Sequence, residues 1–256
     1  MTRLLSGAAL AAAALAAILF LPLFGLRLLA CLVAALAGRE YLAIIHTGRP
    51  VAMAPVLLLV VLTSWALSDP SLSVVLLPLL LAGLAWLAVE VLFRGRTVDQ
   101  AAARLLASWY IGMPLGMLAA VQGLGGPRAT LLLVATIVVS DSGQYYTGRA
   151  FGRRPLAPAI SPKKTIEGAA GGLVLGTSFM TLAGPWVFPA SGRLSLALLG
   201  ATIVLLGIGG DLFESRLKRT AGVKDSSALI PGHGGVLDRI DALLFAVPAY
   251  YLYLRA

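Results

Sequence analysis

The sequence GDLFESRLKRTAGVKDSSALIPGHGGVLDRID, residues 210–241, decides how the rest of the chain is interpreted. Most of the preceding sequence is apolar, whereas this stretch mixes acids with bases around a glycine-rich segment at residues 231–235. Its charged residues are the acids Asp211, Glu214, Asp225, Asp238 and Asp241 and the bases Arg216, Lys218, Arg219, Lys224 and Arg239. Between hydrophobic flanks, such a segment is suited to hold a cation and a polyanion beside lipid.

The chemistry of these side chains favours metal-assisted transfer of a phosphoryl or nucleotidyl group. Carboxylates such as those of Asp211 and Asp238 bind hard divalent cations, which prefer oxygen ligands. Lys218, Arg219 and Lys224 can bind phosphate oxygens, and glycines let backbone N–H groups approach an anion closely. On composition alone, a charge-balanced loop between two membrane helices explains the same residues equally well.

Spacing places several of these polar residues on shared helix faces. If the preceding helix continues out of the membrane, one face carries four polar residues at i, i+3, i+4 and i+7: Asp211, Glu214, Ser215 and Lys218. Asp238 and Asp241 lie three residues apart at the start of the last apolar segment. A favourable placement near the positive end of the helix dipole explains one of these acids more readily than the pair.

The composition excludes a soluble domain and several kinds of site. Of the 256 residues, 59% are hydrophobic and only 12% are charged, which is typical of a membrane protein. The single cysteine, Cys31, lies in an apolar run, and there are only two histidines, so a disulfide framework and a Cys/His metal site are excluded. The net charge of +9 comes from bases in short loops, which fit lipid headgroups and phosphate substrates better than nucleic acid.

Apolar segments of spanning length predict an all-α, polytopic membrane protein with about nine transmembrane helices. The expected spans are 4–24, 26–45, 51–67, 72–93, 105–121, 129–146, 166–188, 194–213 and 236–254. The first is interpreted as a retained helix, because it is longer than the apolar core of a signal peptide and another span follows at once. The seventh is rich in Gly and Ala, which favours close helix packing.

The distribution of basic residues predicts the orientation in the membrane. With nine spans and a cytoplasmic N-terminus, sixteen of the twenty lysines and arginines fall on the cytoplasmic side. The four on the other side are Arg27, Arg128, Arg193 and Arg255. This positive-inside bias predicts a multi-pass protein of the inner (plasma) membrane whose polar segments face the cytoplasm.

Two motifs carry a resemblance to a known family. The first consists of SRLKR at 215–219, Lys224-Asp225 and HGGVLDRID at 233–241; the second consists of DSGQYYTGRAFG at 141–152 and ISPKKTIEG at 160–168. Together they resemble the polar segments of the phosphatidate cytidylyltransferases, or CDP-diacylglycerol synthases. The resemblance covers the C-terminal half, so residues 97–256 are interpreted as the catalytic membrane region and residues 1–96 as generic membrane helices.

The resemblance implies transfer of a cytidylyl group from CTP to phosphatidic acid, giving CDP-diacylglycerol and pyrophosphate for phospholipid synthesis. It assigns Asp211 and Asp238 as metal ligands, with Asp141 and Asp225 as weaker candidates, and Mg²⁺ as the cation. The remaining catalytic candidates are Lys218, Arg219, Lys224 and Asp225, and the substrate-binding candidates are Ser161, Lys163, Lys164, Thr165, Ser215, His233 and Arg239. For His233, a role in a turn and a contact with phosphate or base are equally weighted. A second cation and a homodimer stay open.

Other interpretations of the sequence make different predictions. A CDP-archaeol synthase or a CTP-dependent polyprenol kinase would share the motifs but use another lipid acceptor. A transporter or channel would be expected to show related halves, whereas the polar motifs cluster in the C-terminal half.

We also expect Asp211 and Asp238 to lie roughly 4–8 Å apart in one polar cavity, close enough to share a cation or two adjacent cations. Glu167 is expected to cap or neutralise the seventh helix, and the role of Glu90 is left open.

Overall fold

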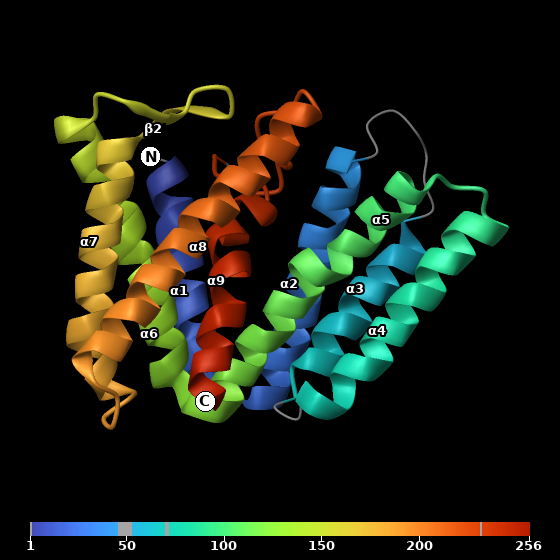
Figure 1. Cartoon of the computed structure of the whole chain (residues 1–256), viewed down its shortest axis with the longest axis horizontal. Coiled ribbons are helices and arrows are strands. Elements are labelled where there is room, and N and C mark those ends of the chain that lie inside the picture. The colour runs from blue at the N-terminus through green and yellow to red at the C-terminus, as the bar shows by residue number, and fades with distance from the viewer. Residues whose placement is uncertain (1, 46–52, 70–71, 231) are drawn as a thin grey trace. The chain divides into compact units, whose positions relative to one another are not determined.

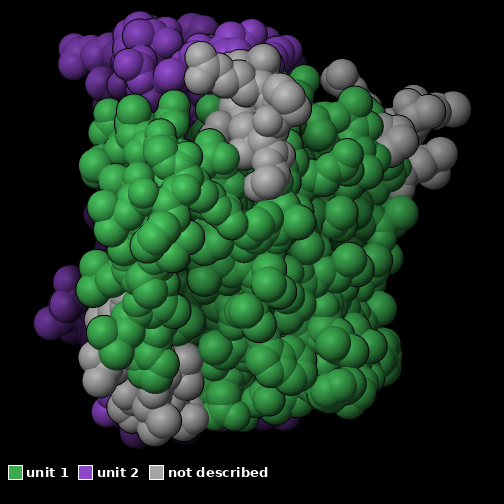
Figure 2. Space-filling model, turned by 90° about the vertical axis from the view of Figure 1, so that its right-hand side faces the viewer, with its two compact units in different colours: residues 1–123, 225–238 green, residues 124–224, 239–256 purple. Residues whose placement is uncertain are grey.

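The computed structural model describes residues 2–45, 53–69, 72–230 and 232–256, and most of the chain is helical (Figure 1). The predicted start of the third span at Val51 and Pro231 of the glycine-rich segment lie outside these residues. Contacts within the chain divide it into two compact units (Figure 2). Unit 1 comprises residues 1–123 and 225–238, and unit 2 comprises residues 124–224 and 239–256. The boundary between residues 96 and 97 rests on the motifs and stays a prediction.

Unit 1 is built from consecutive apolar helices. They are α1 (Thr2–Phe20), α2 (Leu23–Ile45), α3 (Ala54–Leu67), α4 (Leu72–Ala88), the π-helix η1 (Val89–Phe93), α5 (Val98–Ala107), the π-helix η2 (Ser108–Gly112) and the start of α6 (Met113–Phe151). The polar segment 225–238 also belongs to this unit. Thr97 caps α5, because its hydroxyl accepts a hydrogen bond from the backbone N–H of Gln100.

Close packing of α3 against η2 holds the middle of unit 1 together. A Cβ atom at Gly112 would lie 2.5 Å from the Val60 carbonyl oxygen, so only glycine allows this approach of the two helices. Tyr41 of α2 is buried and donates a hydrogen bond of 2.9 Å to the Ala103 carbonyl of α5. The polar end of this aromatic side chain is therefore satisfied inside the apolar core.

Unit 2 contains the rest of α6, a short hairpin and three further helices. The elements are β1 (Pro155–Ala157), β2 (Ser161–Thr165), α7 (Ile166–Ala183), the 3₁₀ helix η3 (Gly184–Trp186), α8 (Arg193–Thr220) and α9 (Leu237–Arg255), whose first two residues belong to unit 1. The strands pair antiparallel. Near its start in this unit, α6 is kinked at Gly126, whose φ of 68° lies in the left-handed region, just before Pro127.

The glycines of α7 bring it close to α6, as the sequence predicted. Cβ atoms at Gly168 and Gly172 would each lie 2.8 Å from a carbonyl oxygen of α6, those of Gln144 and Ser140 respectively. The prediction of close packing along this segment is therefore confirmed. Figure 1 shows α6, α7 and α8 side by side, with the hairpin at the end where α6 leads into α7.

The helices follow the apolar segments expected from the sequence. Four helical stretches among the described residues are long and apolar enough to cross a membrane: Leu23–Ile45, Val98–Phe151, Ile166–Trp186 and Arg193–Thr220. Shorter apolar helices accompany them, and these features are those of a multi-pass, helical membrane protein. Three details differ from the expected spans. The segments 105–121 and 129–146 are joined through α6, which kinks at Gly126 and continues past residue 146 to Phe151. Residues 155–165 form a hairpin where only a polar loop was expected, and α8 continues past Phe213 to Thr220.

Candidate active site

Unit 2 brings together polar residues from both motifs. Lys164 of β2 forms an ion pair with Asp211 of α8, joining Nζ to Oδ2. Ser215, one turn further along α8, donates a hydrogen bond of 3.3 Å to Asp211 Oδ1. Asp141 of α6 and Asp241 of α9 both lie within range of the charges of Asp211 and Lys164. We call these five residues the acidic cluster.

Neighbouring side chains hold the members of the acidic cluster in place. Gln144 donates a hydrogen bond of 3.0 Å to Asp141 Oδ1, one turn back along α6. Asp241 accepts a hydrogen bond of 2.7 Å at Oδ1 from the Ala242 backbone N–H. A Cβ atom at Gly210 would lie 2.5 Å from the Asp241 carbonyl oxygen, so glycine lets α8 and α9 approach beside Asp211.

The face predicted for residues 211–218 forms, because α8 stays helical beyond the apolar segment. Glu214 and Lys218 are both buried and form an ion pair of 2.5 Å between Oε2 and Nζ. The attraction between the two charges offsets part of the cost of removing them from water. Lys218 is thus placed one turn from Ser215, with its charge also within range of Asp241.

The acidic cluster has the donor chemistry of a site for a hard cation. Its oxygens come from carboxylates and one hydroxyl, and the Lys164 ammonium beside Asp211 shows that this carboxylate accommodates a positive charge. No group of three or more His, Cys, Asp and Glu side chains within the described ranges is arranged as a metal site. Mg²⁺ does not require such a group, because it binds through one or two carboxylates, water and substrate phosphates.

The other predicted residues of unit 2 lie at its polar edge. Thr165 is the N-cap of α7, since its hydroxyl accepts a hydrogen bond of 3.1 Å from the Gly168 backbone N–H. Arg219 donates to the carbonyl oxygens of Ile160 and Val223, at 3.4 Å and 3.1 Å, and so links α8 to the hairpin. Exposed or half-buried residues complete this set: Ser161, Lys163, Lys224 and Arg239.

Glu167 was expected to cap or neutralise the seventh helix, but Thr165 is the cap and Glu167 makes a different structural contact. Its Oε2 atom accepts hydrogen bonds from the backbone N–H groups of Arg153 and Arg154, at 3.0 Å and 3.2 Å. The carboxylate therefore closes the turn between α6 and β1. This contact fixes where the hairpin that carries Lys164 begins.

Asp238 belongs to unit 1, where its carboxylate organises the loop before α9. Three donors converge on Asp238 Oδ2: the Ser226 backbone N–H at 2.9 Å, the Ser226 hydroxyl at 2.8 Å and the Gly235 backbone N–H at 2.7 Å. The loop needs glycine at 234, whose φ is 81° and where a Cβ atom would lie 2.6 Å from Asp238 Oδ2. Asp225 lies at the exposed start of this loop.

A second carboxylate, which lies outside both sequence motifs, contacts the same loop. Glu40 of α2 is 6% exposed and accepts four hydrogen bonds from the segment 226–237. In the sequence, Glu40 is marked only as an acid near the end of an apolar segment. Burying a carboxylate there is unfavourable in free energy unless its charge is paired or hydrogen-bonded.

His233 contacts another part of unit 1. The Ser6 hydroxyl of α1 lies 2.9 Å from His233 Nδ1, and the His233 backbone N–H donates to the Ile230 carbonyl at 2.9 Å. The backbone hydrogen bond is that of a tight turn, which is one of the two roles weighed from the sequence. A contact with substrate stays a prediction.

Glu90, whose role the sequence left open, is fully buried among three arginines in unit 1. Its carboxylate lies 2.6 Å from Arg94, 2.7 Å from Arg96 and 3.4 Å from Arg104. Arg104 of α5 is also fully buried. This group of charges joins η1 to α5 and the turn between them.

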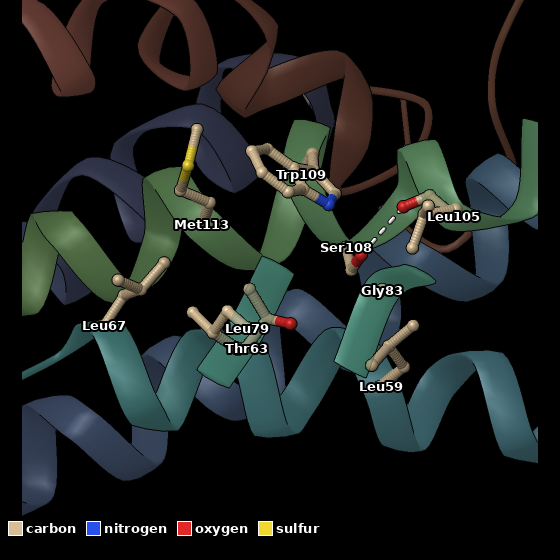
Figure 3. A pocket seen from close by; sticks show the side chains of 9 residues that line it. All are labelled: Leu59, Thr63, Leu67, Leu79, Gly83, Leu105, Ser108, Trp109 and Met113. Carbon is tan, nitrogen blue, oxygen red and sulfur yellow. Dashed lines mark hydrogen bonds between the residues drawn. The ribbon is translucent and has the colours of Figure 1, made fainter. Parts of the chain in front are cut away.

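A pocket in unit 1 differs in character from the acidic cluster (Figure 3). Its lining comes from α3, α4, α5, η2 and the start of α6: Leu59, Thr63, Leu67, Leu79, Gly83, Leu105, Ser108, Trp109 and Met113. Ser108 uses its hydroxyl to donate a hydrogen bond of 2.7 Å to the Leu105 carbonyl. None of these nine described lining residues is charged, so the pocket offers no charged group to bind a phosphate or a cation.

Comparison with protein families decides where the chain belongs. The cytidylyltransferase family model matches residues 1–256. The chain belongs to the cytidylyltransferase family.

The expected separation of Asp211 and Asp238 concerns residues of different units and stays a prediction.

Curated relatives of the chain match it over part of their length. The phosphatidate cytidylyltransferase of Pseudomonas aeruginosa is 46% identical over 134 residues, which cover 51% of this chain and 49% of the relative. That of Bacillus subtilis is 40% identical over 167 residues, covering 62% of this chain and 60% of the relative. That of Haemophilus influenzae is 48% identical over 130 residues, covering 48% and 45%. The chain thus spans about half the length of these relatives.

Proposed function

We propose that this cytidylyltransferase joins CTP to phosphatidic acid and releases CDP-diacylglycerol and pyrophosphate. The names of the curated relatives state the same activity class. The observation that carries the proposal is the ion pair between Lys164 and Asp211. It joins the SPKKT hairpin to the polar end of α8, so that bases able to bind phosphate lie beside carboxylates able to bind a cation.

In the proposed reaction a phosphate oxygen of the lipid attacks the α-phosphorus of CTP, and the bond from that phosphorus to the bridging oxygen of pyrophosphate breaks. The second pKa of a phosphate monoester is roughly 6, so the attacking group is already largely anionic at neutral pH. No general base from the protein is required. The protein then acts by positioning the two substrates and by neutralising charge on the phosphates.

Bases of unit 2 are proposed to bind the triphosphate. Lys163 is exposed on the hairpin beside Lys164, and Lys218 lies on the α8 face that carries Asp211 and Ser215. Charge-assisted hydrogen bonds from such groups orient phosphate oxygens and stabilise the departing pyrophosphate. Arg219 and Lys224 extend the same basic edge.

Mg²⁺ is the proposed cofactor, and Asp211, Asp238 and Asp141 are its proposed ligands. When bound, this ion neutralises phosphate charge and orients the triphosphate. A second cation is compatible with the number of acids. In the acidic cluster, Gln144 and Ser215 hold Asp141 and Asp211 in fixed orientations.

The proposed membrane topology has nine spans and a cytoplasmic N-terminus. It is supported by the agreement between the described helices and the apolar segments and by the bias of basic residues toward one side. In this topology the acidic cluster lies at the cytoplasmic interface, where a soluble nucleotide and a two-tailed lipid can meet. A homodimer is compatible with this arrangement.

The test is an assay of the purified chain with labelled CTP and several lipid acceptors. Release of pyrophosphate that requires both Mg²⁺ and phosphatidic acid supports the proposal. Transfer to an archaeal ether lipid alone would reassign the acceptor. Release of CDP in place of pyrophosphate would identify a kinase and overturn the proposal.

Replacing both Lys163 and Lys164 with Gln is expected to raise the KM for CTP much more than the KM for phosphatidic acid. Hydrogen bonds to charged groups contribute about 1.5–3 kcal/mol each, so the increase for CTP should be at least about tenfold. Steady-state kinetics with each substrate varied in turn measure both constants.

Arg216→Gln is the matched control, because Arg216 is an exposed base on α8 without a proposed role at the site. Its KM for CTP should stay near that of the wild type. An unchanged dependence on CTP in the double lysine variant would leave Lys163 and Lys164 as topological anchors on the basic side of the membrane.

A further inference from the structure

We infer that Glu40 is a positioning residue that holds the loop 226–237 and thereby orients Asp238. This inference rests on the proposed role of Asp238 in the reaction. Glu40 lies on α2, far from the polar motifs in the sequence, and is 6% exposed. Because a buried carboxylate near the end of an apolar helix is costly, its contacts point to a specific use of the charge.

The four hydrogen bonds of Glu40 are divided evenly between its two oxygens. Oε1 accepts from the Ser227 hydroxyl at 2.6 Å and from the Val236 backbone N–H at 3.0 Å. Oε2 accepts from the Ser226 hydroxyl at 3.0 Å and from the Leu237 backbone N–H at 2.8 Å. The carboxylate therefore ties both ends of the loop to α2.

Two of these contacts lead directly to Asp238. Leu237 is the residue before Asp238, and the Ser226 hydroxyl lies 2.8 Å from Asp238 Oδ2 as well as 3.0 Å from Glu40 Oε2. Ser226 has a single hydroxyl hydrogen, which it can donate to only one of the two carboxylates at a time, so its hydroxyl bridges Glu40 and Asp238. There is no room between them for a larger residue at Gly235, where a Cβ atom would lie 2.5 Å from Glu40 Oε2.

Only a carboxylate offers an acceptor to both backbone N–H groups at this position. In Glu40→Gln an amide NH₂ group replaces one oxygen, and each oxygen faces one backbone N–H, which cannot accept a hydrogen bond. Whichever way the amide is turned, Val236 or Leu237 loses its acceptor. Glu40→Gln keeps the size of the side chain and removes one backbone hydrogen bond. It therefore tests whether the charge of Glu40 holds the loop, apart from any effect of side-chain size.

The first measurement reports on the loop without requiring activity. A nitroxide label is attached at Leu229→Cys, an exposed loop position, in a Cys31→Ala background that removes the single native cysteine. Glu40→Gln should make the label more mobile on the nanosecond timescale. The control Asp99→Asn removes an exposed acid from the same unit and should leave the spectrum unchanged.

The second measurement is turnover of the full-length chain with CTP and phosphatidic acid. Glu40→Gln should lower kcat by about 10-fold to 100-fold, the usual effect of removing a residue that orients a ligand-bearing group. The KM for CTP should change little, because the bases proposed to bind the triphosphate are untouched. The thermal midpoint should fall by only a few degrees, because one backbone N–H loses its acceptor, and a transition that stays cooperative separates positioning from a loss of folding.

The two measurements distinguish this inference from the proposed function. An unchanged label spectrum in Glu40→Gln would overturn the inference, as would a mobile label with an unchanged kcat. If the wild type shows no transfer to phosphatidic acid, the proposed function fails, and the label still decides whether Glu40 anchors the loop. If Glu40→Gln does not fold, Ser227→Ala is tested in its place, because it removes only one of the four donors. This variant should give smaller changes of the same sign in label mobility and in kcat. If both quantities stay at the wild-type value, the inference is overturned.

Discussion

Replacing Asp211 with Asn should lower turnover by at least about 100-fold while the protein stays folded in detergent. The change removes the negative charge that pairs with Lys164 and that is proposed to bind the cation. Charge stabilisation by a bound metal contributes several kcal/mol, and each 1.36 kcal/mol is a factor of ten in rate. Pyrophosphate release by the purified variant, with size-exclusion behaviour as the measure of folding, tests this expectation.

Asp238→Asn should have a comparable effect for a related reason. Three donors around Asp238 converge on Oδ2, so the amide oxygen of Asn can accept the same hydrogen bonds. The variant therefore removes the charge and keeps these three contacts. Asp99→Asn serves as the control for both variants, since Asp99 is an exposed acid in the first turn of α5.

Activity near the wild-type level in either variant would remove that residue from the proposed metal site. A loss in Asp211→Asn alone would confine the cation to the acidic cluster of unit 2. An experimental structure with Mg²⁺ and CTP would then measure the separation between Asp211 and Asp238 directly. A separation well outside roughly 4–8 Å would contradict the shared-cation arrangement.

Replacing Glu90 with Gln should destabilise the protein by about 3–5 kcal/mol, the usual cost of leaving the charge of a buried ion pair uncompensated. Glu90 and Arg104 are both fully buried, and Arg94 and Arg96 also lie within 2.7 Å of the Glu90 carboxylate. Unfolding of the purified protein by denaturing detergent measures the change.

A double variant separates burial of charge from loss of packing at this site. Glu90→Met combined with Arg104→Met removes both buried charges and keeps long apolar side chains, so it should recover much of the stability lost in Glu90→Gln. If Glu90→Gln were as stable as the wild type, the three arginines would not depend on this carboxylate. Equal instability of the double variant would assign the effect to packing.

Much of the candidate site could be predicted because its signals are local in the sequence. The i, i+3, i+4 and i+7 spacing of residues 211–218 required only that α8 remain helical past Phe213, and it does so to Thr220. The Gly-rich pattern of α7 indicated a close approach to α6, which the positions of Gly168 and Gly172 confirm. Periodicity and residue size act over one or two turns, so a sequence displays them directly.

Contacts between distant segments could not be predicted in the same way. The sequence shows that Asp241 lies three residues after Asp238. Its place beside Asp211 depends on how α9 packs on α8. The hairpin at residues 155–165 was expected as a loop, because a strand of three residues carries no clear alternation. The fixed start of that hairpin depends on Glu167, which bonds to residues more than ten positions earlier.

The sequence by itself determined that this is a helical membrane protein with two polar motifs of a cytidylyltransferase, because apolar length and motif spacing are properties of the chain. Only the tertiary structure decided the partners of its buried acids. Glu40 and Glu90 both lie in apolar segments, but one binds the loop of Asp238 and the other binds three arginines. The reason is physical: a buried carboxylate must find donors in the low dielectric of the interior, and the fold alone determines which donors are within reach.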